Sequence, residues 1–244
     1  MIPALFKAIF YEPLYNGLIF LFHVLPWADA GLIVILFTVL VKLVLFPLSK
    51  KSVETQMIMK KIQPELEALK IKHKNNREEQ ARAMMALYKE RKLNPLAGIF
   101  LVIIQIPIIL ALYWVFLNGG LPKVDASLLY NWVPVPNSIS MNFLGLLDIS
   151  QKSIFVAILA GVSQFFQMRY ALPATPAKSG KPSFKDDLAR SMSLQMKYVM
   201  PVFIVIIAYQ LPAVVGFYWV TSNLFAIGQE IVVRRRYRLD QNPV

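Results

Sequence analysis

The sequence predicts an all-α membrane protein with five transmembrane helices. Of its 244 residues, 57% are hydrophobic and only 16% are charged, whereas a typical soluble domain has about 25% charged residues. The apolar residues form long runs of nearly uncharged sequence, and a helix needs roughly 20 such residues to cross a bilayer. Lysine and arginine are concentrated in alternate connections between these runs, which is typical of a chain that crosses a membrane repeatedly.

The first segment, residues 1–28, predicts an amphipathic helix that lies in the outer interface of the membrane. Glu12-Pro13 is expected to interrupt the apolar run, and the part that remains before Trp27 is short for a span. Its mixture of aromatic, aliphatic and polar residues fits an interfacial helix. A signal peptide is the alternative, but the segment lacks a basic n-region and a small-residue cleavage site.

The apolar stretches after this helix predict five spans, of which the last two are separated near Pro212. The stretch from Tyr198 to Val233 is too long for one span, and proline is disfavoured inside a helix but favoured at its start. For the outer loop we expect short helices that rest on the membrane. The predicted order is span 29–49, cytoplasmic helical hairpin 50–95, span 96–117, outer loop 118–152, span 153–170, cytoplasmic loop 171–197, spans 198–211 and 212–233, and basic cytoplasmic tail 234–244.

The basic residues also predict the orientation of the chain. Segments 50–95, 171–197 and 234–244 are rich in lysine and arginine, whereas 118–152 contains only Lys123 and Lys152. Because cytoplasmic loops are enriched in these residues, the N-terminus is expected outside and the C-terminus in the cytoplasm. Most of the net charge of +12 therefore reflects topology, which weakens a nucleic-acid-binding interpretation.

The cytoplasmic segment 50–95 has the apolar periodicity of two helices, separated by KHKNNREE. One interpretation is that these helices pack on each other or lie on anionic headgroups. The other is a contact surface, because methionine is flexible and suits varied apolar partners. The charge-rich faces of the same helices would suit a ribosome or a targeting factor. The candidate residues of this surface are Met57, Met59, Met84 and Met85.

Lys42 lies inside the first predicted span, in FTVLVKLVLFPL. An ionised lysine at the centre of a bilayer costs at least ~2.5–3.5 kcal/mol on insertion scales. Ser49 follows seven residues later, about 10 Å along a helix, so snorkelling to the cytoplasmic interface is one interpretation. The other is a polar cavity, because Thr38 and Ser49 share the helical face of Lys42.

Polar side chains in the other spans favour the cavity. Each of them alone would be an interhelical hydrogen bond worth about 0.6 kcal/mol, but together they indicate a hydrated space within the membrane. No carboxylate is placed to neutralise Lys42 there, so the cavity would offer its charge to a visiting anionic group. The candidate residues are Gln105, Ser163, Gln164, Gln167, Tyr218, Thr221, Ser222, Asn223 and Gln229.

No catalytic or metal-binding pattern is present in the sequence. The chain has no cysteine and two histidines, His23 and His73, in unrelated contexts. It contains no HExxH, GxSxG or Walker-type loop. We therefore expect neither an enzyme nor a bound cofactor or metal.

Three separated segments resemble the YidC/Oxa/Alb family of membrane protein insertases: FTVLVKLVLFPLSKKS, MMALYKERKLNPLAGIFLVIIQIPIILALYWVFL and LPAVVGFYWVTSNLFAIGQE. The similarity runs over residues 10–236 and is that of a short, core-only member. It implies a polar groove that is open to the cytoplasm and to lipid but closed on the outer side. Lys42 takes the position of a central positive residue, usually arginine in the family. The other positions that match the groove are Thr38, Tyr218, Trp219, Ser222 and Asn223.

The resemblance implies that the chain inserts small membrane proteins and helps them fold in the bacterial plasma membrane, without hydrolysing nucleotides itself. The implied partners are nascent membrane proteins, the lipid bilayer, the ribosome and a Sec translocon. Two alternatives are a small anion channel or transporter, in which Lys42 selects the ion, and a scaffold that binds partner helices without inserting them.

Overall fold

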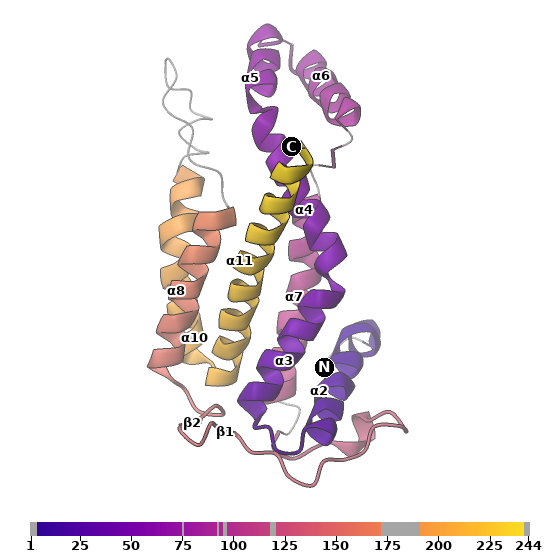
Figure 1. The fold of residues 1–244 in the computed structure, drawn as a ribbon, viewed down its shortest axis with the longest axis vertical. Coiled ribbons are helices and arrows are strands. Elements are labelled where there is room, and N and C mark those ends of the chain that lie inside the picture. The colour runs from indigo at the N-terminus through magenta and orange to yellow at the C-terminus, as the bar shows by residue number, and fades with distance from the viewer. Residues whose placement is uncertain are drawn as a thin grey trace. The chain divides into compact units, whose positions relative to one another are not determined.

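The protein is mostly helical, as a computed structural model of residues 4–74, 76–91, 93–94, 97–117, 121–171 and 191–241 shows (Figure 1). The expected all-α class is confirmed, since the only strands among these residues are two of two residues each. Internal contacts divide the chain into two units, Met1–Val44 with Gln105–Gly228, and Leu45–Ile104 with Gln229–Val244. The two units are described separately.

The first unit begins with one continuous helical segment rather than an interrupted one. Helix α1 (Ala4–Phe6), the π-helical turn η1 (Lys7–Tyr11) and α2 (Glu12–Val24) follow one another without a break. The expected interruption at Glu12-Pro13 is wrong, because the wider π turn, in which the Glu12 N–H donates to the Lys7 carbonyl, accommodates the proline. The segment Ala4–Val24 is long and apolar enough to cross a membrane, and its interfacial placement stays a prediction.

Helix α3 (Ala30–Val44) is shorter than the span predicted for 29–49, because the helix breaks at Leu45. Residues 46–49 belong instead to the next helix, α4 (Phe46–Lys61), which has Pro47 in its first turn. Proline lacks an N–H and its ring would clash with the Leu43 carbonyl in an uninterrupted helix. Taken as one broken span, α3 and α4 are apolar and long enough to cross a membrane.

The loop that was predicted to lie outside, and that keeps the name outer loop here, connects α7 (Ala97–Leu117) to α8 (Ile154–Ala171). Instead of several short helices it contains one 3-10 turn, η2 (Ala126–Leu128), and a hairpin of β1 (Asn142–Phe143) and β2 (Leu147–Asp148). The strands are antiparallel, and Asn142 pairs with Asp148. The expectation of short helices is thus wrong for the part of the loop that includes this hairpin.

The last elements of this unit are closely packed helices. A helix from Ser191 leads through η3 (Gln195–Val199) into α10 (Met200–Gln210), and α11 (Ala213–Gln241) follows after Pro212, as predicted. Helices α8 and α10 lie side by side (Figure 1), and small residues permit this approach. A Cβ on Gly161 would lie 2.2 Å from a methyl group of Val205, so a larger side chain there would separate the pair.

In the described part of the chain, three helices are long and apolar enough to cross a membrane: Ala4–Val24, Ile154–Ala171 and Ser191–Gln210. The broken pair α3 and α4 would be a fourth. From α7 only the shorter apolar stretch Gln105–Phe116 enters this count, so the predicted number of five spans stays a prediction. Helix α11 is long enough, but Ser222, Asn223 and Gln229 make it more polar than a typical span.

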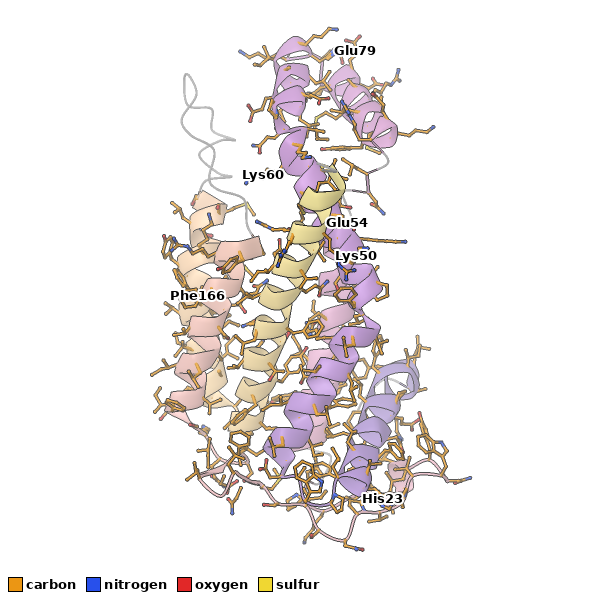
Figure 2. All side chains as sticks on the ribbon, viewed as in Figure 1. His23, Lys50, Glu54, Lys60, Glu79 and Phe166 are labelled. Carbon is orange, nitrogen blue, oxygen red and sulfur yellow. The ribbon has the colours of Figure 1, made fainter. Side chains whose placement is uncertain are left out.

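The second unit contains the predicted helical hairpin, formed by α5 (Gln63–Lys72) and α6 (Arg77–Glu90). The Asn76 side chain accepts the N–H groups of Glu78 and Glu79 and thereby caps α6. Charged side chains lie on the outside of these helices (Figure 2), for example Glu79 on α6, which contacts His73 at the end of α5. The apolar core of the hairpin consists of Ile62, Leu66, Leu87 and Leu93.

Candidate functional site

A chain of hydrogen bonds connects Lys42 on α3, Gln105 on α7 and Tyr218 on α11. The Lys42 Nζ donates to Gln105 Oε1 at 2.9 Å, and Gln105 Nε2 donates to the Tyr218 hydroxyl. These residues are 63 and 113 positions apart in sequence. Three polar residues that were singled out individually, each in an otherwise apolar helix, therefore form one site.

The positive charge of Lys42 is met by a neutral amide. Among the described residues, no carboxylate forms an ion pair with it. A lysine ammonium has three donors, and Gln105 takes one of them. The structure shows no partner among the described residues for the other two donors.

Tyr218 is the most enclosed member of the site, with only 3% of its surface exposed. Ser222, one helical turn further along α11, is also buried and forms a side-chain hydrogen bond with Tyr218. Because a buried hydroxyl is costly without a partner, these contacts fix Tyr218 and with it the amide of Gln105.

Thr38 shares a face with Lys42, as predicted, but its hydroxyl is used within its own helix. It donates to the Val34 carbonyl at 2.7 Å, and the residue is 1% exposed. Thr38 therefore packs next to the site without offering it a free hydroxyl group.

The remaining predicted site residues lie around a second contact, between α8 and α11. Asn223 Nδ2 donates to the Ser163 hydroxyl at 3.0 Å, and this hydroxyl donates to the Ala160 carbonyl. Gln164 contacts Gln167 within α8, whereas Trp219 packs against the apolar cluster of α8 and α10. The structure thus groups Lys42, Gln105, Tyr218 and Ser222, and it places Asn223, Gln164 and Trp219 in other contacts.

The four methionines proposed as a contact surface have different surroundings. Met59 and Met84 pack against the apolar core of the hairpin, where they serve its own stability. Met85 is exposed and Met57 is half-buried. Met59 and Met84 are half-buried as well, so Met85 is the one of the four that is mostly exposed.

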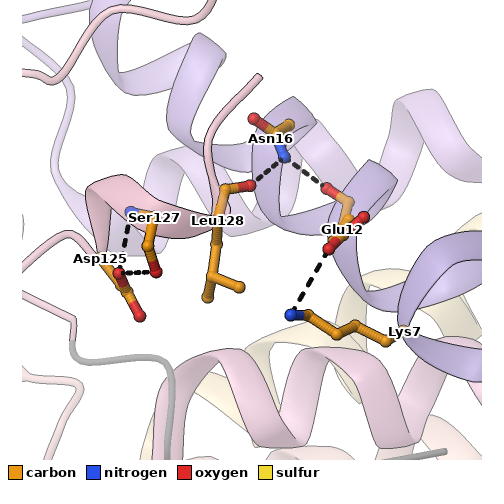
Figure 3. A network of polar contacts seen from close by, with 6 residues as sticks. All are labelled: Lys7, Glu12, Asn16, Asp125, Ser127 and Leu128. Carbon is orange, nitrogen blue, oxygen red and sulfur yellow. Dashed lines mark hydrogen bonds and ion pairs between the residues drawn. The ribbon is translucent and has the colours of Figure 1, made fainter. Parts of the chain in front are cut away.

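Asn16 on α2 is a residue that the sequence interpretation missed (Figure 3). Its amide nitrogen donates to the carbonyls of Glu12 and Leu128, and its Oδ1 accepts the N–H of Tyr130 at 2.7 Å. Nearby, Lys7 pairs with Glu12. Asn16 thus joins the first helical segment to the outer loop. The available signal was a lone amide in the apolar run YNGLIF.

The described residues contain no group of three or more histidines or carboxylates that could hold a metal ion. The polar site instead consists of one cation, one amide and hydroxyl groups, enclosed by apolar helices. Together with the candidate spans, this combination defines a multi-pass membrane protein with a half-buried lysine that forms no ion pair with a carboxylate of the described residues.

The comparison with known proteins identifies the family. The model of the family described as 60Kd inner membrane protein matches residues 21–241. The chain therefore belongs to this family, which is the YidC/Oxa/Alb family, and the resemblance found in the sequence is confirmed.

Individual relatives agree with this assignment. The chain is 31% identical over 211 residues to proteins named membrane protein insertase YidC from Francisella tularensis subsp. novicida (strain U112), subsp. tularensis (strain WY96-3418) and subsp. holarctica (strain FTNF002-00 / FTA). The match covers 85% of this chain and 33% of each relative. The chain thus spans about a third of the length of these relatives. Its family and its apolar helices make it a multi-pass protein of the bacterial inner membrane.

Proposed function

We propose that this chain inserts small membrane proteins into the bilayer and helps them fold. The observation that carries the proposal is Lys42, which is half-buried among apolar helices and held by the amide of Gln105. A lysine retained there without a carboxylate is expensive, so a role for its charge in receiving a substrate accounts for its presence. The names of the relatives add support.

The proposed role of Lys42 is to receive the acidic outer segment of a nascent substrate. Moving one aspartate to the centre of a membrane costs about 2.5–3.5 kcal/mol on insertion scales. Two opposite charges about 4 Å apart attract each other by about 4 kcal/mol at an effective dielectric constant near 20, before desolvation is counted. The attraction is of the same size as the cost, so a transient contact with Lys42 lowers the barrier substantially. Burial of the apolar part of the substrate in lipid then provides the driving force.

Gln105 suits a transient contact. An amide oxygen can be displaced by a carboxylate, because the carboxylate accepts the same hydrogen bond from the ammonium and adds the attraction between two opposite charges. When the substrate leaves, the amide takes its place again, and the buried Tyr218 keeps it in position. The lysine is therefore never left without an acceptor.

The proposal includes a hydrophilic groove, open to the cytoplasm, between five transmembrane helices. Its wall would contain Lys42, Gln105 and Tyr218, and the polar residues Ser222 and Asn223 of α11 support a wet environment. In this arrangement the N-terminus lies outside, α5 and α6 project into the cytoplasm, and the C-terminus is cytoplasmic. The proposed groove residues are Thr38, Lys42, Gln105, Gln164, Tyr218, Trp219, Ser222 and Asn223.

The hairpin is proposed to contact the ribosome, and a Sec translocon is a further proposed partner. Met85 and Met57 offer apolar surface, and the surrounding basic residues suit a negatively charged partner. The chain itself would not hydrolyse nucleotides.

Reconstitution of the purified chain in liposomes tests the function. A short single-span substrate with an acidic outer tail should be inserted by the unaltered chain and by Lys42→Arg, but at least tenfold more slowly by Lys42→Glu. Lys123→Glu, in the outer loop, is the matched control and should insert normally. Crosslinking to the substrate without insertion would identify a scaffold, and an ion conductance in planar bilayers would identify a channel; either result would refute the proposal.

A further inference from the structure

The turn of the outer β-hairpin exposes two leucines. It consists of residues 144–146, between β1 and β2, and Leu144 and Leu146 are 60% and 87% exposed. From Met141 to Leu147 the sequence MNFLGLL contains no charged residue. If the tip of the hairpin faced water, the exposure of these two leucine side chains would be unfavourable in free energy.

The backbone conformation of the turn makes a leucine at residue 144 still more unusual. Leu144 and Gly145 have φ values of 51° and 72°, the φ pattern of a type I′ turn, and the Leu146 N–H donates to the Phe143 carbonyl. Asparagine, aspartate or glycine is strongly preferred at such positions, because a leucine with positive φ is strained. The conformation of the turn therefore does not explain why residue 144 is a leucine.

The hairpin is firmly attached to the beginning of α3. The Asp29 carboxylate accepts the N–H of Leu144 through one oxygen and the N–H of Leu32 through the other, both at 2.9 Å. The Ala30 N–H donates to the Ser140 carbonyl at 2.8 Å. The Phe143 ring lies so close to Gly31 that a Cβ there would be 2.3 Å from it.

The hairpin is also attached to the beginning of α11 and leads directly into α8 (Figure 1). The N–H of Val214 donates to the Ile149 carbonyl and that of Ala213 to the Gln151 carbonyl. The Phe143 and Phe217 rings are 4.5 Å apart. The turn is thus fixed at the first residues of α3, α8 and α11. Because α8 and the pair α3 and α4 are candidate membrane spans, the ends of these helices are where the chain would leave the apolar part of a bilayer.

We propose that residues 144–146 are a membrane anchor, whose two leucines enter the boundary between headgroups and acyl chains of the outer leaflet. The bilayer is the occupant that the attachment favours, because it necessarily surrounds the ends of these spans. Trp27, in the connection between α2 and α3, and Trp132, in the same loop as the hairpin, are exposed as well, and tryptophan is enriched at this level of a membrane. The anchor would hold the outer ends of three helices at a fixed depth.

The absence of cysteine from the chain permits a direct test with one thiol. Leu146→Cys, labelled with the fluorophore NBD, is reconstituted in liposomes that contain lipids with a doxyl quencher near the headgroup end of the acyl chain. We expect a blue-shifted emission and at least twofold quenching. The matched control is Glu79→Cys, an exposed position at the start of α6, which should show neither.

A second substitution separates anchoring from folding of the turn. Leu144→Asn suits positive φ, so it should preserve the hairpin but reduce the quenching of the probe at residue 146 by about half. A water-like emission without quenching in the Leu146→Cys protein would overturn the proposal. A blue shift without lipid quenching would do the same, because it would show a protein partner. The assay contains no substrate, so its outcome is independent of the proposed insertase function.

Discussion

Two cations on apolar helices of this protein have different partners. Lys42 on α3 donates to an amide oxygen, whereas Arg234 on α11 forms an ion pair with Glu230 at 2.7 Å. The Glu230 side chain is only 8% exposed, so the arginine meets a nearly buried carboxylate one helical turn away. A charge paired in this way has its counter-ion permanently present. The difference is the basis of the proposed function: Lys42 has a neutral partner that a substrate carboxylate would replace, whereas Arg234 already has a carboxylate partner in the protein.

Gln105→Glu should have the largest effect, because it converts the first arrangement into the second. The new carboxylate would pair with Lys42 and compete with an acidic substrate segment. We expect insertion of substrates with acidic tails to fall at least tenfold, equivalent to about 1.4 kcal/mol, in the liposome assay. Gln105→Met, which has a similar size, is the control for shape. Undiminished insertion by Gln105→Glu would show that Lys42 does not have to be free to bind the acidic segment of the substrate.

Glu230→Ala should affect stability rather than insertion. Removal of one partner from a buried ion pair typically costs 3–5 kcal/mol. Arg234 remains a third exposed, so we expect a loss of about 2–3 kcal/mol in the free energy of unfolding. Thermal unfolding in lipid nanodiscs measures it. At a temperature where the variant is folded, its insertion rate should stay within twofold of that of the unaltered chain. A loss of insertion as large as that of Lys42→Glu would show that the two cations do not have different roles.

Asn16→Ala extends the comparison to a buried polar group without charge. The substitution leaves the Leu128 carbonyl and the Tyr130 N–H without their partner, and each unsatisfied group costs about 1 kcal/mol or more. We expect about 2 kcal/mol of destabilisation and faster hydrogen exchange at Tyr130. Exchange in the hairpin of α5 and α6 serves as the internal control. Unchanged exchange at Tyr130 would contradict a role of Asn16 in holding the outer loop.

The smallest effect concerns Asp125, a fully exposed anion of the outer loop. Hydrogen bonds from the side chain and the N–H of Ser127 lower the pKa of this carboxyl below its ordinary value of 3.8. Because the folded-state pKa is depressed, the stabilisation is complete above the unfolded-state value and is lost as the pH falls through the folded-state value. Ser127→Ala should raise the pKa toward 3.8, as measured by NMR titration. A pKa that is identical in both proteins would show that this contact is absent in solution.

The helical class could be predicted, because long apolar runs have few alternatives in a membrane protein, and the helices Ile154–Ala171 and Ser191–Gln210 lie where spans were predicted. The helix ends at prolines were less predictable. Pro47 breaks the first span where a continuous helix was expected, whereas Pro13 is accommodated by a π turn and breaks nothing. Whether a proline interrupts a helix depends on backbone adjustments that composition does not encode.

The site was predictable in its members but not in its contacts. Lys42, Gln105 and Tyr218 stand out because each is polar in an apolar run. Their association depends on the packing of helices that are distant in sequence. Tyr218 and Trp219 were both assigned to the groove, yet neighbouring residues on a helix point in directions about 100° apart. Packing places Tyr218 at Gln105 and Trp219 against α8 and α10.

The roles of the methionines in α4 and α6, and the hairpin of the outer loop, could not be predicted from sequence patterns for other reasons. An apolar stripe on a charged helix is compatible both with an internal core and with a partner surface, so the roles of Met59 and Met85 could not be separated. The outer hairpin was missed because Leu144 occupies a turn position where asparagine or glycine is the usual signal. An unfavourable residue at such a position is itself an indication of function.

The most direct test of the central claim compares Lys42→Gln with Lys42→Arg. Both replacements are polar, but only arginine keeps the charge. The measurement is the ratio of insertion rates for a substrate with an acidic outer tail and a matched substrate with a neutral tail, in liposomes. We predict that Lys42→Arg preserves this ratio, whereas Lys42→Gln lowers it at least tenfold while neutral tails are inserted almost normally. An unchanged ratio for Lys42→Gln would show that the site needs polarity alone, and would contradict the proposal that the charge of Lys42 receives the substrate.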